Sequence, residues 1–151
     1  MTILKDTKLS GLRGFIDRIR DIGKPKVLVG VPASKNRPHD AGGISMAGLA
    51  AVHELGIGVP ERSYLRSAIL EGRGELTATI AQGTVAYSRQ NKKLDANFYN
   101  NIGLFGSNLV KAKIAKGPFT PLKPETIKRK GSSLPLVDTG ALRQAFTWEV
   151  R

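Results

Sequence analysis

The first pattern along the chain is a set of hydrophobic positions that recur at steps of three and four residues. These positions are Leu9, Leu12, Phe15, Ile16, Ile19 and Ile22. Their spacing predicts an amphipathic helix over residues 9–22, which ends at Gly23. The β-branched stretch 26–31 follows between two prolines and predicts a strand. Its nearly continuous apolar sequence favours burial on both faces.

The hydrophobic pattern is lost between residues 32 and 43. Two prolines, two glycines and several polar residues predict a mobile loop there. A helix is predicted over 44–55, because this stretch is rich in Ala and Leu, with Ser45 placed as its N-cap and Gly56 as its stop. After a turn, helical character resumes over 64–70.

Two helices of greater length are predicted over 74–87 and 95–114, joined by the polar link 88–94. In the second, apolar positions again recur at helical steps: Phe98, Ile102, Phe105, Leu109 and Ala112 or Lys113. The glycines at positions 72, 74, 83, 103 and 106 argue against one unbroken helix, because glycine weakens helix interiors.

The remainder of the chain predicts shorter elements. They are a helical stretch within 121–130, a loop over 131–135, a helix over 140–144 capped by Thr139, and an alternating strand over 145–150. The simplest partner for this last strand is the strand at 26–31, paired antiparallel and packed under helices.

These elements predict an α+β fold, with a small antiparallel sheet packed with several α-helices. A length of 151 residues favours a single domain spanning 1–151. Long flexible loops are expected at about 32–43 and 117–137.

Composition narrows the class of protein. The chain has no cysteine, which excludes disulfides, cysteine-ligated zinc and thiol nucleophiles. No apolar run is long enough to cross a membrane, and the first residues lack the apolar core of a signal peptide, so we expect a protein made in the cytosol that does not contact membranes. Its 24 Lys and Arg against 12 Asp and Glu give a net charge of +12.

The positive charge is concentrated after residue 110, where the chain has nine basic residues and three acidic ones. One interpretation is contact with phosphate groups or acidic partners. The other is a surface whose net charge prevents self-association. Aromatic residues are too few and too scattered for a platform that stacks the bases of a single strand.

The residues that catalysis requires are poorly represented. His53 and Glu54 are not followed by a second histidine at metalloprotease spacing, and His39 reads as a surface residue. No glycine-rich segment continues into a phosphate-binding loop. We therefore expect no enzyme, no cofactor and no catalytic or metal site.

Two segments stand out for a different reason. The first combines AAVHELG at 50–56 with VPERSYLRSA at 59–68. The second combines FTPLKPET at 119–126, RKG at 129–131 and PLVDTGAL at 135–142. Without further information, the first segment predicts a helix–turn–helix of the core, and the second predicts a basic loop before a capped helix.

In this order the segments resemble the virion-morphogenesis and tail-completion (neck) family of tailed bacteriophages. That family has a helix ending in His-Glu-aromatic/Leu-Gly, followed by Ile/Val-Pro-x-Arg-x-aromatic-Leu-Arg. A later stretch reads Pro-Leu-x-x-x-Thr-x-x-x-Lys-Gly and then Pro-Leu-x-Asp-Thr-Gly-x-Leu. The resemblance covers roughly residues 26–150, with Leu55 and Ser63 as departures from the usual residues.

The resemblance implies a structural protein without catalysis, which forms a homo-oligomeric ring at the head–tail junction of the virion, as a neck, tail-completion or tail-terminator protein. Its partners would be further copies of itself, the head–tail connector, and tail-tube or other tail proteins, with genome DNA passing through the channel. Assembly would take place in the cytoplasm of the host bacterium. A ring requires head-to-tail contacts that close by rotation, and loops that become ordered on assembly.

The resemblance also implies candidate residues for the contacts between subunits and partners. They are His53, Glu54, Pro60, Arg62, Tyr64, Arg66, Leu122, Lys128, Arg129, Lys130, Asp138 and Thr139. Arg62 and Arg66 are expected to be exposed, beside the rigid Pro60, and to meet carboxylates of a neighbour. Two alternatives remain open: a basic module that binds nucleic acid, and an enzyme such as a nuclease, for which no metal-binding carboxylate cluster is found.

Overall fold

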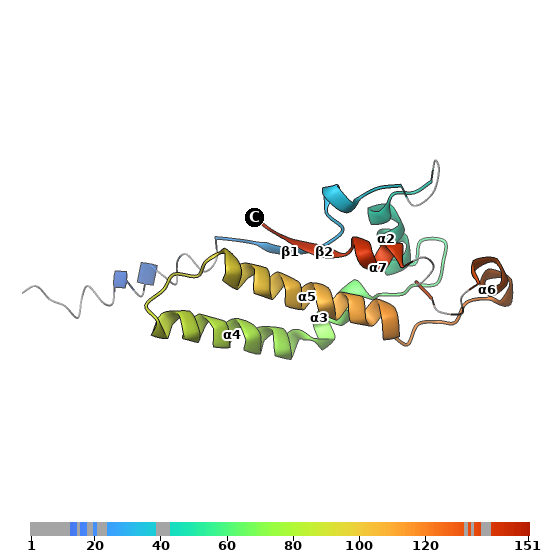
Figure 1. The fold of residues 1–151 in the computed structure, drawn as a ribbon. Helices are drawn as coiled ribbons and strands as arrows, with labels where there is room; N and C mark the ends of the chain where they lie inside the picture. The colour runs from blue at the N-terminus through green and yellow to red at the C-terminus, as the bar shows by residue number, and fades with distance from the viewer. Residues whose placement is uncertain are drawn as a thin grey trace, which may run out of the picture.

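The fold is taken from a computed structural model that describes residues 13–14, 16–17, 20, 24–38, 43–131, 133, 135–136 and 140–151. In chain order its elements are β1 (Val27–Gly30), the 3-10 helix η1 (Ala33–Lys35), α2 (Met46–Leu55), α3 (Leu65–Glu71), α4 (Arg73–Arg89), α5 (Ala96–Lys116), α6 (Pro124–Lys130), α7 (Ala141–Ala145) and β2 (Thr147–Val150) (Figure 1). The predicted α+β class is confirmed. Most of the predicted helix over 9–22 lies outside the described residues.

The strands nearest the two ends of the described fold pair with each other. β1 and β2 form an antiparallel sheet in which Val27 lies opposite Val150 and Gly30 lies opposite Thr147. Lys26 and Arg151 extend the ladder by exchanging two backbone hydrogen bonds, of 2.6 and 2.9 Å. The predicted pairing of the first and last strands is confirmed.

The sheet packs directly on α5, the 21-residue helix that runs the length of the fold (Figure 1). The close approach depends on two glycines. A Cβ on Gly103 would overlap the Trp148 indole, and one on Gly106 would lie 3.1 Å from Cγ2 of Val29. The helix predicted over 95–114 is confirmed as α5, which continues through both glycines because packing under the sheet outweighs their weak helix propensity.

The most buried face of α5 also differs from the predicted stripe. Its buried residues are Phe98, Tyr99, Gly103, Gly106, Ser107, Val110 and Ile114. Of the predicted stripe, Phe98 is buried and Leu109 is half-buried. Leu109 lies against Gly72 between α3 and α4, and Phe98 lies against Gly83 of α4. Thus α5 has two packing faces, one under the sheet and one against α3 and α4.

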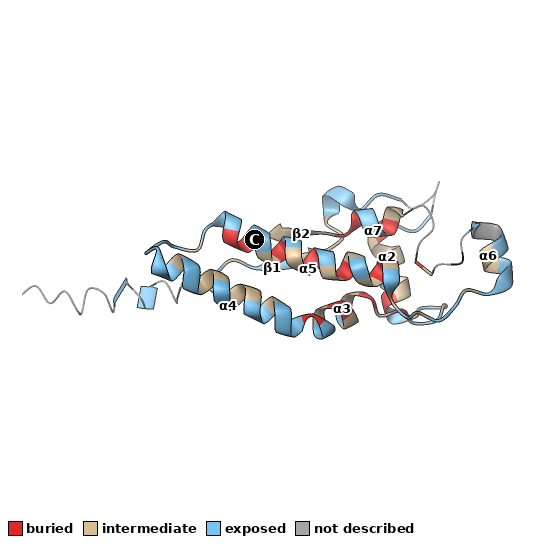
Figure 2. Ribbon diagram, turned by 60° about the horizontal axis from the view of Figure 1, so that its bottom comes forward, coloured by how far each residue is buried: buried red, intermediate tan, exposed pale blue. Residues whose placement is uncertain are grey.

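The apolar core lies where α2, α3, α5 and α7 meet (Figure 2). Its buried members are Ala50, Tyr64, Ala68, Val110, Ile114, Leu136, Leu142 and Phe146. Tyr64 is completely buried; its ring meets Phe146 edge to face at 5.4 Å, and its hydroxyl donates to the carbonyl of Ala50 at 2.9 Å. This pair joins the middle of the chain to its C-terminal end.

The prediction that the first strand is buried on both faces is wrong. Leu28 is 44 % exposed, whereas Val29, which points to the other face, packs on α5. In the described part of the chain, no second layer of structure covers the outer face of the sheet.

Regular structure interrupts both of the predicted loops. The first contains η1 and ends in an isolated bridge between Pro38 and Ser45. Ser45 then caps α2 by accepting a hydrogen bond from the Gly48 amide at 3.2 Å, as predicted. The second contains α6, which lies beyond the C-terminal end of α5 (Figure 1). The described helices include none that is long and apolar enough to cross a bilayer.

The packing of the sheet on α5 is tested by Gly103→Ala. Because the added methyl group would overlap the Trp148 indole, we expect the free energy of unfolding to fall by about 2 kcal/mol in urea denaturation. Gly74→Ala on α4 is the control, since no atom lies within 4 Å of its Cβ position, and it should leave stability unchanged or slightly raised. Equal stability of the two variants would contradict this account of the packing.

Candidate functional site

The first motif folds into a tight turn between α2 and α3. Gly56 ends α2 with φ = +70°, in the left-handed region that favours glycine, and its amide donates to the carbonyl of Val52. A Cβ on Gly56 would lie 3.0 Å from the backbone nitrogen of Glu61. The chain therefore turns back on itself at this glycine and returns toward the side of α2.

Glu54, the last buried residue of α2, is the centre of this turn. Its carboxylate accepts hydrogen bonds from the Leu65 amide at 2.8 Å and from the Arg66 amide at 3.0 Å. The hydroxyl of Ser63 donates to the same carboxylate at 3.0 Å. These donors stand at the N-terminus of α3, whose free amides attract a negative charge. One buried carboxylate thus fixes the end of α2 to the beginning of α3.

Arg66 closes the network from outside. Its Nε donates to the Glu54 carboxylate at 3.0 Å, and its Nη2 donates to the Glu54 carbonyl at 3.3 Å and to Glu61 at 2.7 Å. The hydrogen bond to Glu54, more than any other contact, raises the pKa of Arg66. The side chain is 57 % exposed but already holds two carboxylates of its own chain. We call Glu54, Ser63, Leu65 and Arg66 the carboxylate hub.

The pKa of Glu54 reflects two opposing effects. Burial raises it, because a carboxylate loses its hydration, but the hydrogen bonds from Leu65, Arg66 and Ser63 stabilise the ionised form and together lower it below its ordinary value. Burial and the nearby charge of Glu54 raise the pKa of Tyr64, which stays a neutral donor to its carbonyl partner. The hub therefore carries a charged carboxylate at neutral pH.

Arg62 is placed differently from our expectation. It is 5 % exposed, so the prediction that it presents a free charge to a neighbour is wrong. Its amide donates to the carbonyl of His53 at 2.8 Å, and its guanidinium lies 3.3 Å from Nδ1 of the same histidine. Its Nε has no hydrogen-bond partner among the described residues, and burial lowers its pKa. Arg62 is therefore buried in the turn, two residues before Tyr64, which is buried in the core.

The turn exposes apolar side chains that the sequence analysis did not select. Leu55 is 57 % exposed and Ile57 is 58 % exposed, on either side of Gly56. We call these two residues the apolar tip. Large aliphatic residues that flank a helix-ending glycine were the available signal, because the helical pattern that would bury them stops there. Pro60 is also exposed, in the same turn.

The residues of the second motif are only partly brought to this site. Leu136 and Leu142 join the core beside Tyr64, so the two motifs meet through buried side chains. Leu122, just before α6, is half-buried, and Lys128, within α6, is exposed. Arg129 and Lys130 belong to α6, but their side chains are outside the description, as are Asp138 and Thr139 altogether.

The predicted cap of the last helix needs a correction. Gly140, not Thr139, stands at the N-cap position of α7. Its φ of +75° is the left-handed conformation that glycine adopts without a steric penalty.

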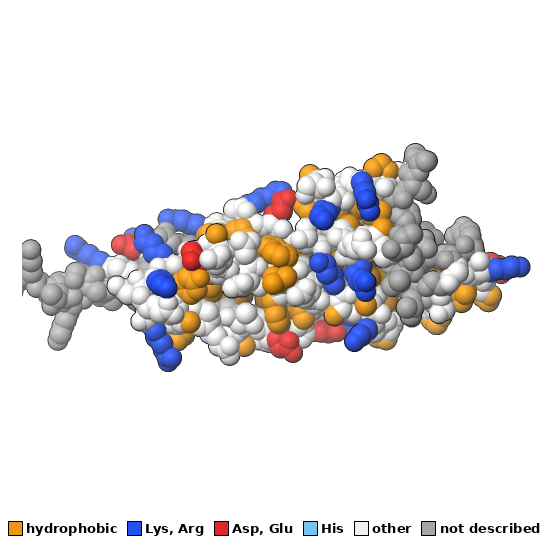
Figure 3. Space-filling view, viewed as in Figure 1, with side chains coloured by type: hydrophobic (Ala, Val, Ile, Leu, Met, Phe, Trp, Pro, Cys, Tyr) orange, Lys and Arg blue, Asp and Glu red, His pale blue; other side chains and the backbone are white. Residues whose placement is uncertain are grey.

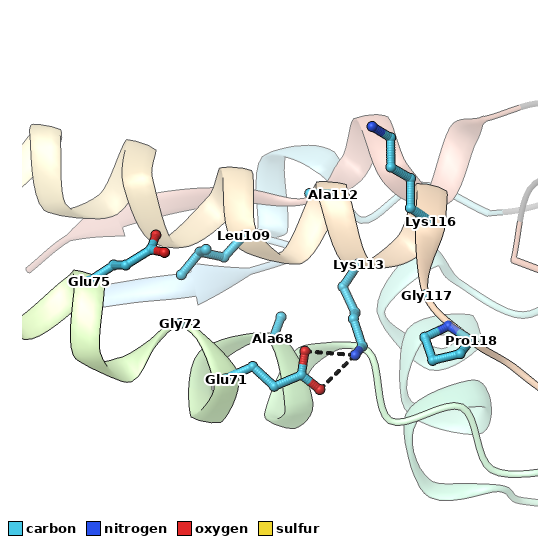
Figure 4. Close-up of a pocket in the computed structure, with 10 residues that line it drawn as sticks. All are labelled: Ala68, Glu71, Gly72, Glu75, Leu109, Ala112, Lys113, Lys116, Gly117 and Pro118. Atoms are coloured by element: carbon cyan, nitrogen blue, oxygen red, sulfur yellow. Dashed lines mark hydrogen bonds and ion pairs between the residues drawn. The ribbon is translucent and has the colours of Figure 1, made fainter.

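A groove of about 410 Å³ lies between α3 and the C-terminal half of α5 (Figure 4). Across it, Lys113 forms a bidentate ion pair with Glu71, at 2.6 and 2.8 Å. Leu109, Ala112 and Pro118 add apolar surface to its lining. The groove thus combines a satisfied ion pair and the charged residues Glu75 and Lys116 with aliphatic side chains.

The chemistry available in the described residues is limited. They contain no group of three or more His, Cys, Asp or Glu residues placed to hold a metal ion. Comparisons with known protein families, curated proteins and solved structures found no match to this chain. The features of this chain that bear on its function are therefore the carboxylate hub, the apolar tip and the distribution of side chains on its surface.

The carboxylate hub is tested by Glu54→Gln. At pH 7 we expect the free energy of unfolding to fall by about 2 kcal/mol, because the amide donates where the carboxylate accepts. Since the pKa of Glu54 is lowered on folding, its contribution is present above the ordinary value of 4.5 and is lost as pH falls through the folded value. The difference between wild type and variant, measured by urea denaturation, should therefore shrink between pH 5 and pH 3.

Glu75→Gln on the exposed surface of α4 is the matched control and should change stability by less than about 0.5 kcal/mol. A difference for Glu54→Gln that grows on acidification would contradict the role assigned to the charged carboxylate.

The burial of Arg62 is tested by Arg62→Ala. Loss of its packed side chain should lower the free energy of unfolding by about 2 kcal/mol. Arg89→Ala, at the exposed end of α4, removes the same charge and should change stability by less than about 0.5 kcal/mol. If thermal denaturation shows the same stability for both variants, the guanidinium of Arg62 is not part of the core.

Proposed function

We propose that this protein is a structural subunit of a tailed-bacteriophage virion, and that it assembles into a ring at the head–tail junction, joining the capsid connector to the tail. The observation that carries the proposal is the apolar tip, held on the carboxylate hub. Three of the four hub residues, Glu54, Leu65 and Arg66, belong to the motif behind the family resemblance, and the hub holds the turn that exposes Leu55 and Ile57.

The tip has the properties of a protein contact. Leu55 and Ile57 flank Gly56 and are each more than half exposed, so a partner that covers them gains hydrophobic stabilisation. The turn below them is held by Gly56 and by the hydrogen bonds of Glu54, so little conformational freedom is lost when a partner binds. A rigid turn of this kind supports assembly rather than the binding of a small molecule.

The rest of the surface supports the same class of function. Leu28, Leu70, Val85 and Leu104 are also between 44 and 68 % exposed. Figure 3 shows hydrophobic side chains gathered over the middle of one face, with Lys and Arg side chains around them. Exposed aliphatic groups within a charged surround are typical of interfaces between subunits that meet in water.

The proposal is tested with the double variant Leu55→Glu, Ile57→Glu. The wild-type chain should form closed rings, seen by negative-stain electron microscopy and by native mass spectrometry. The variant should keep the thermal stability of the monomer, because both side chains are exposed, but its association should weaken at least 100-fold on the hot-spot scale.

Gln82→Glu, on the exposed face of α4, adds negative charge elsewhere and should leave the rings intact. A wild-type chain that stays monomeric at all concentrations, or a double variant that assembles normally, would refute this use of the tip.

A second candidate function is a basic module that binds nucleic acid. The observation that favours it is a surface hollow of about 260 Å³ lined by Lys35 and Arg37, with no acidic side chain in its lining. Binding of duplex DNA would weaken with added salt in proportion to the phosphates contacted. Ring formation that needs no DNA and tolerates salt would favour the structural role instead.

A further inference from the structure

Each strand of the sheet has an outer edge that no other described residue pairs with. Lys26 and Arg151 exchange two backbone hydrogen bonds, so they form a hydrogen-bonded pair of the antiparallel ladder. Such pairs alternate with non-hydrogen-bonded pairs, which here are Val27 with Val150 and Val29 with Trp148. The backbone N–H and C=O groups of these four residues therefore point away from the partner strand.

These outward groups have no hydrogen bond to any described residue. An isolated sheet of two strands is marginally stable, and natural edges are commonly blocked by prolines, charges or covering segments. Here Pro25 and Pro32 lie outside β1, and no charged side chain lies within it. The single charged residue of β2, Glu149, is already paired with Arg151 at 2.7 Å.

We propose that the two edges are partners of each other in different copies of the chain. The outer edge of β1 in one copy adds to the outer edge of β2 in the next copy, so that the small sheets join into one continuous sheet around the assembly. This proposal rests on the proposed ring, and it names one of the surfaces by which the ring closes.

Strand direction is compatible with this arrangement. In a head-to-tail ring every copy has the same orientation relative to its neighbours. Because β1 and β2 run antiparallel within a copy, β2 of one copy meets β1 of the next in the antiparallel sense. No reversal of the chain is needed, and every junction repeats the antiparallel sense of the ladder inside the subunit.

The side chains on the outer face of the sheet fit the same neighbour. In a register shifted by two residues from the one within the subunit, Lys26 would lie opposite Glu149 of the next copy and Leu28 opposite Thr147, so a basic side chain would approach an acidic one. Pairing about a two-fold axis would instead place each strand beside its own copy, without this charge complementarity. Leu28, 44 % exposed, would be covered by the added strand.

The first experiment removes one outward hydrogen-bond donor with Val27→Pro. The Val27 N–H points away from β2, so proline at this edge position spares the ladder within the subunit. Thermal stability of the monomer should be nearly unchanged, and the dissociation constant of the assembly should rise at least tenfold in sedimentation velocity. Val27→Thr keeps the N–H and the β-branched shape, and it should assemble as the wild type does.

The second experiment uses the absence of cysteine from the chain. Leu28→Cys and Glu149→Cys are prepared as separate variants, so that neither can form a disulfide within one subunit. Co-expressed and oxidised, they should give a disulfide-linked dimer that contains one copy of each. The experiment is repeated with Leu28→Cys paired with Thr147→Cys and then with Arg151→Cys. These pairs detect a register between copies that is shifted by two residues in either direction.

The outcomes separate this proposal from the proposed function. Mixed disulfide dimers, with loss of assembly in Val27→Pro, support the continuous sheet. The continuous sheet is overturned, while the ring itself stands, if a folded Val27→Pro variant still forms rings and the cysteine variants give no mixed disulfide.

Dimers formed by Leu28→Cys alone indicate pairing about a two-fold axis and also overturn the continuous sheet. If Val27→Pro fails to fold, the disulfide result decides alone. A wild-type chain that forms no ring refutes the proposed function and the continuous sheet with it.

Discussion

The close packing of the two-stranded sheet on α5 is the constraint on which the rest of the structure depends. Gly103 and Gly106 let the strands approach the helix axis, and the Trp148 indole occupies the space left by the first of them. Two strands of four residues would be marginal without this support. Because the strands come from distant parts of the sequence, their packing also brings Phe146 to Tyr64 and so closes the core.

The carboxylate hub fixes the turn between α2 and α3. Burial of Glu54 would be unfavourable alone, but the amides at the beginning of α3 and the guanidinium of Arg66 more than offset the lost hydration. The result is a turn with a defined geometry beneath Leu55 and Ile57. The packed core, the hydrogen-bonded turn and the exposed aliphatic side chains support the proposed role as a subunit that contacts other proteins.

The sequence predicted much of the fold and little of the site geometry. Caps and periodicity located α2 and α5, and the alternating residues near the C-terminus located β2. The family resemblance suggested Arg62 and Arg66 as a pair of exposed charges, but Arg62 is buried and Arg66 already pairs with Glu54 and Glu61. Spacing along a turn does not show which side chains point inward, because that depends on the elements packed against the turn.

The sequence by itself determined the α+β class, the absence of cysteine chemistry and the order of the two motifs, since these depend on local spacing and composition. The tertiary structure alone decided that the glycines of α5 serve packing and that Arg62 is buried. It also decided that the sheet packs on α5 by one face and that its two outer edges have no partner among the described residues. The physical reason is the same in each case. Burial and pairing are properties of surfaces that meet in space, and residues far apart in the chain supply the two sides.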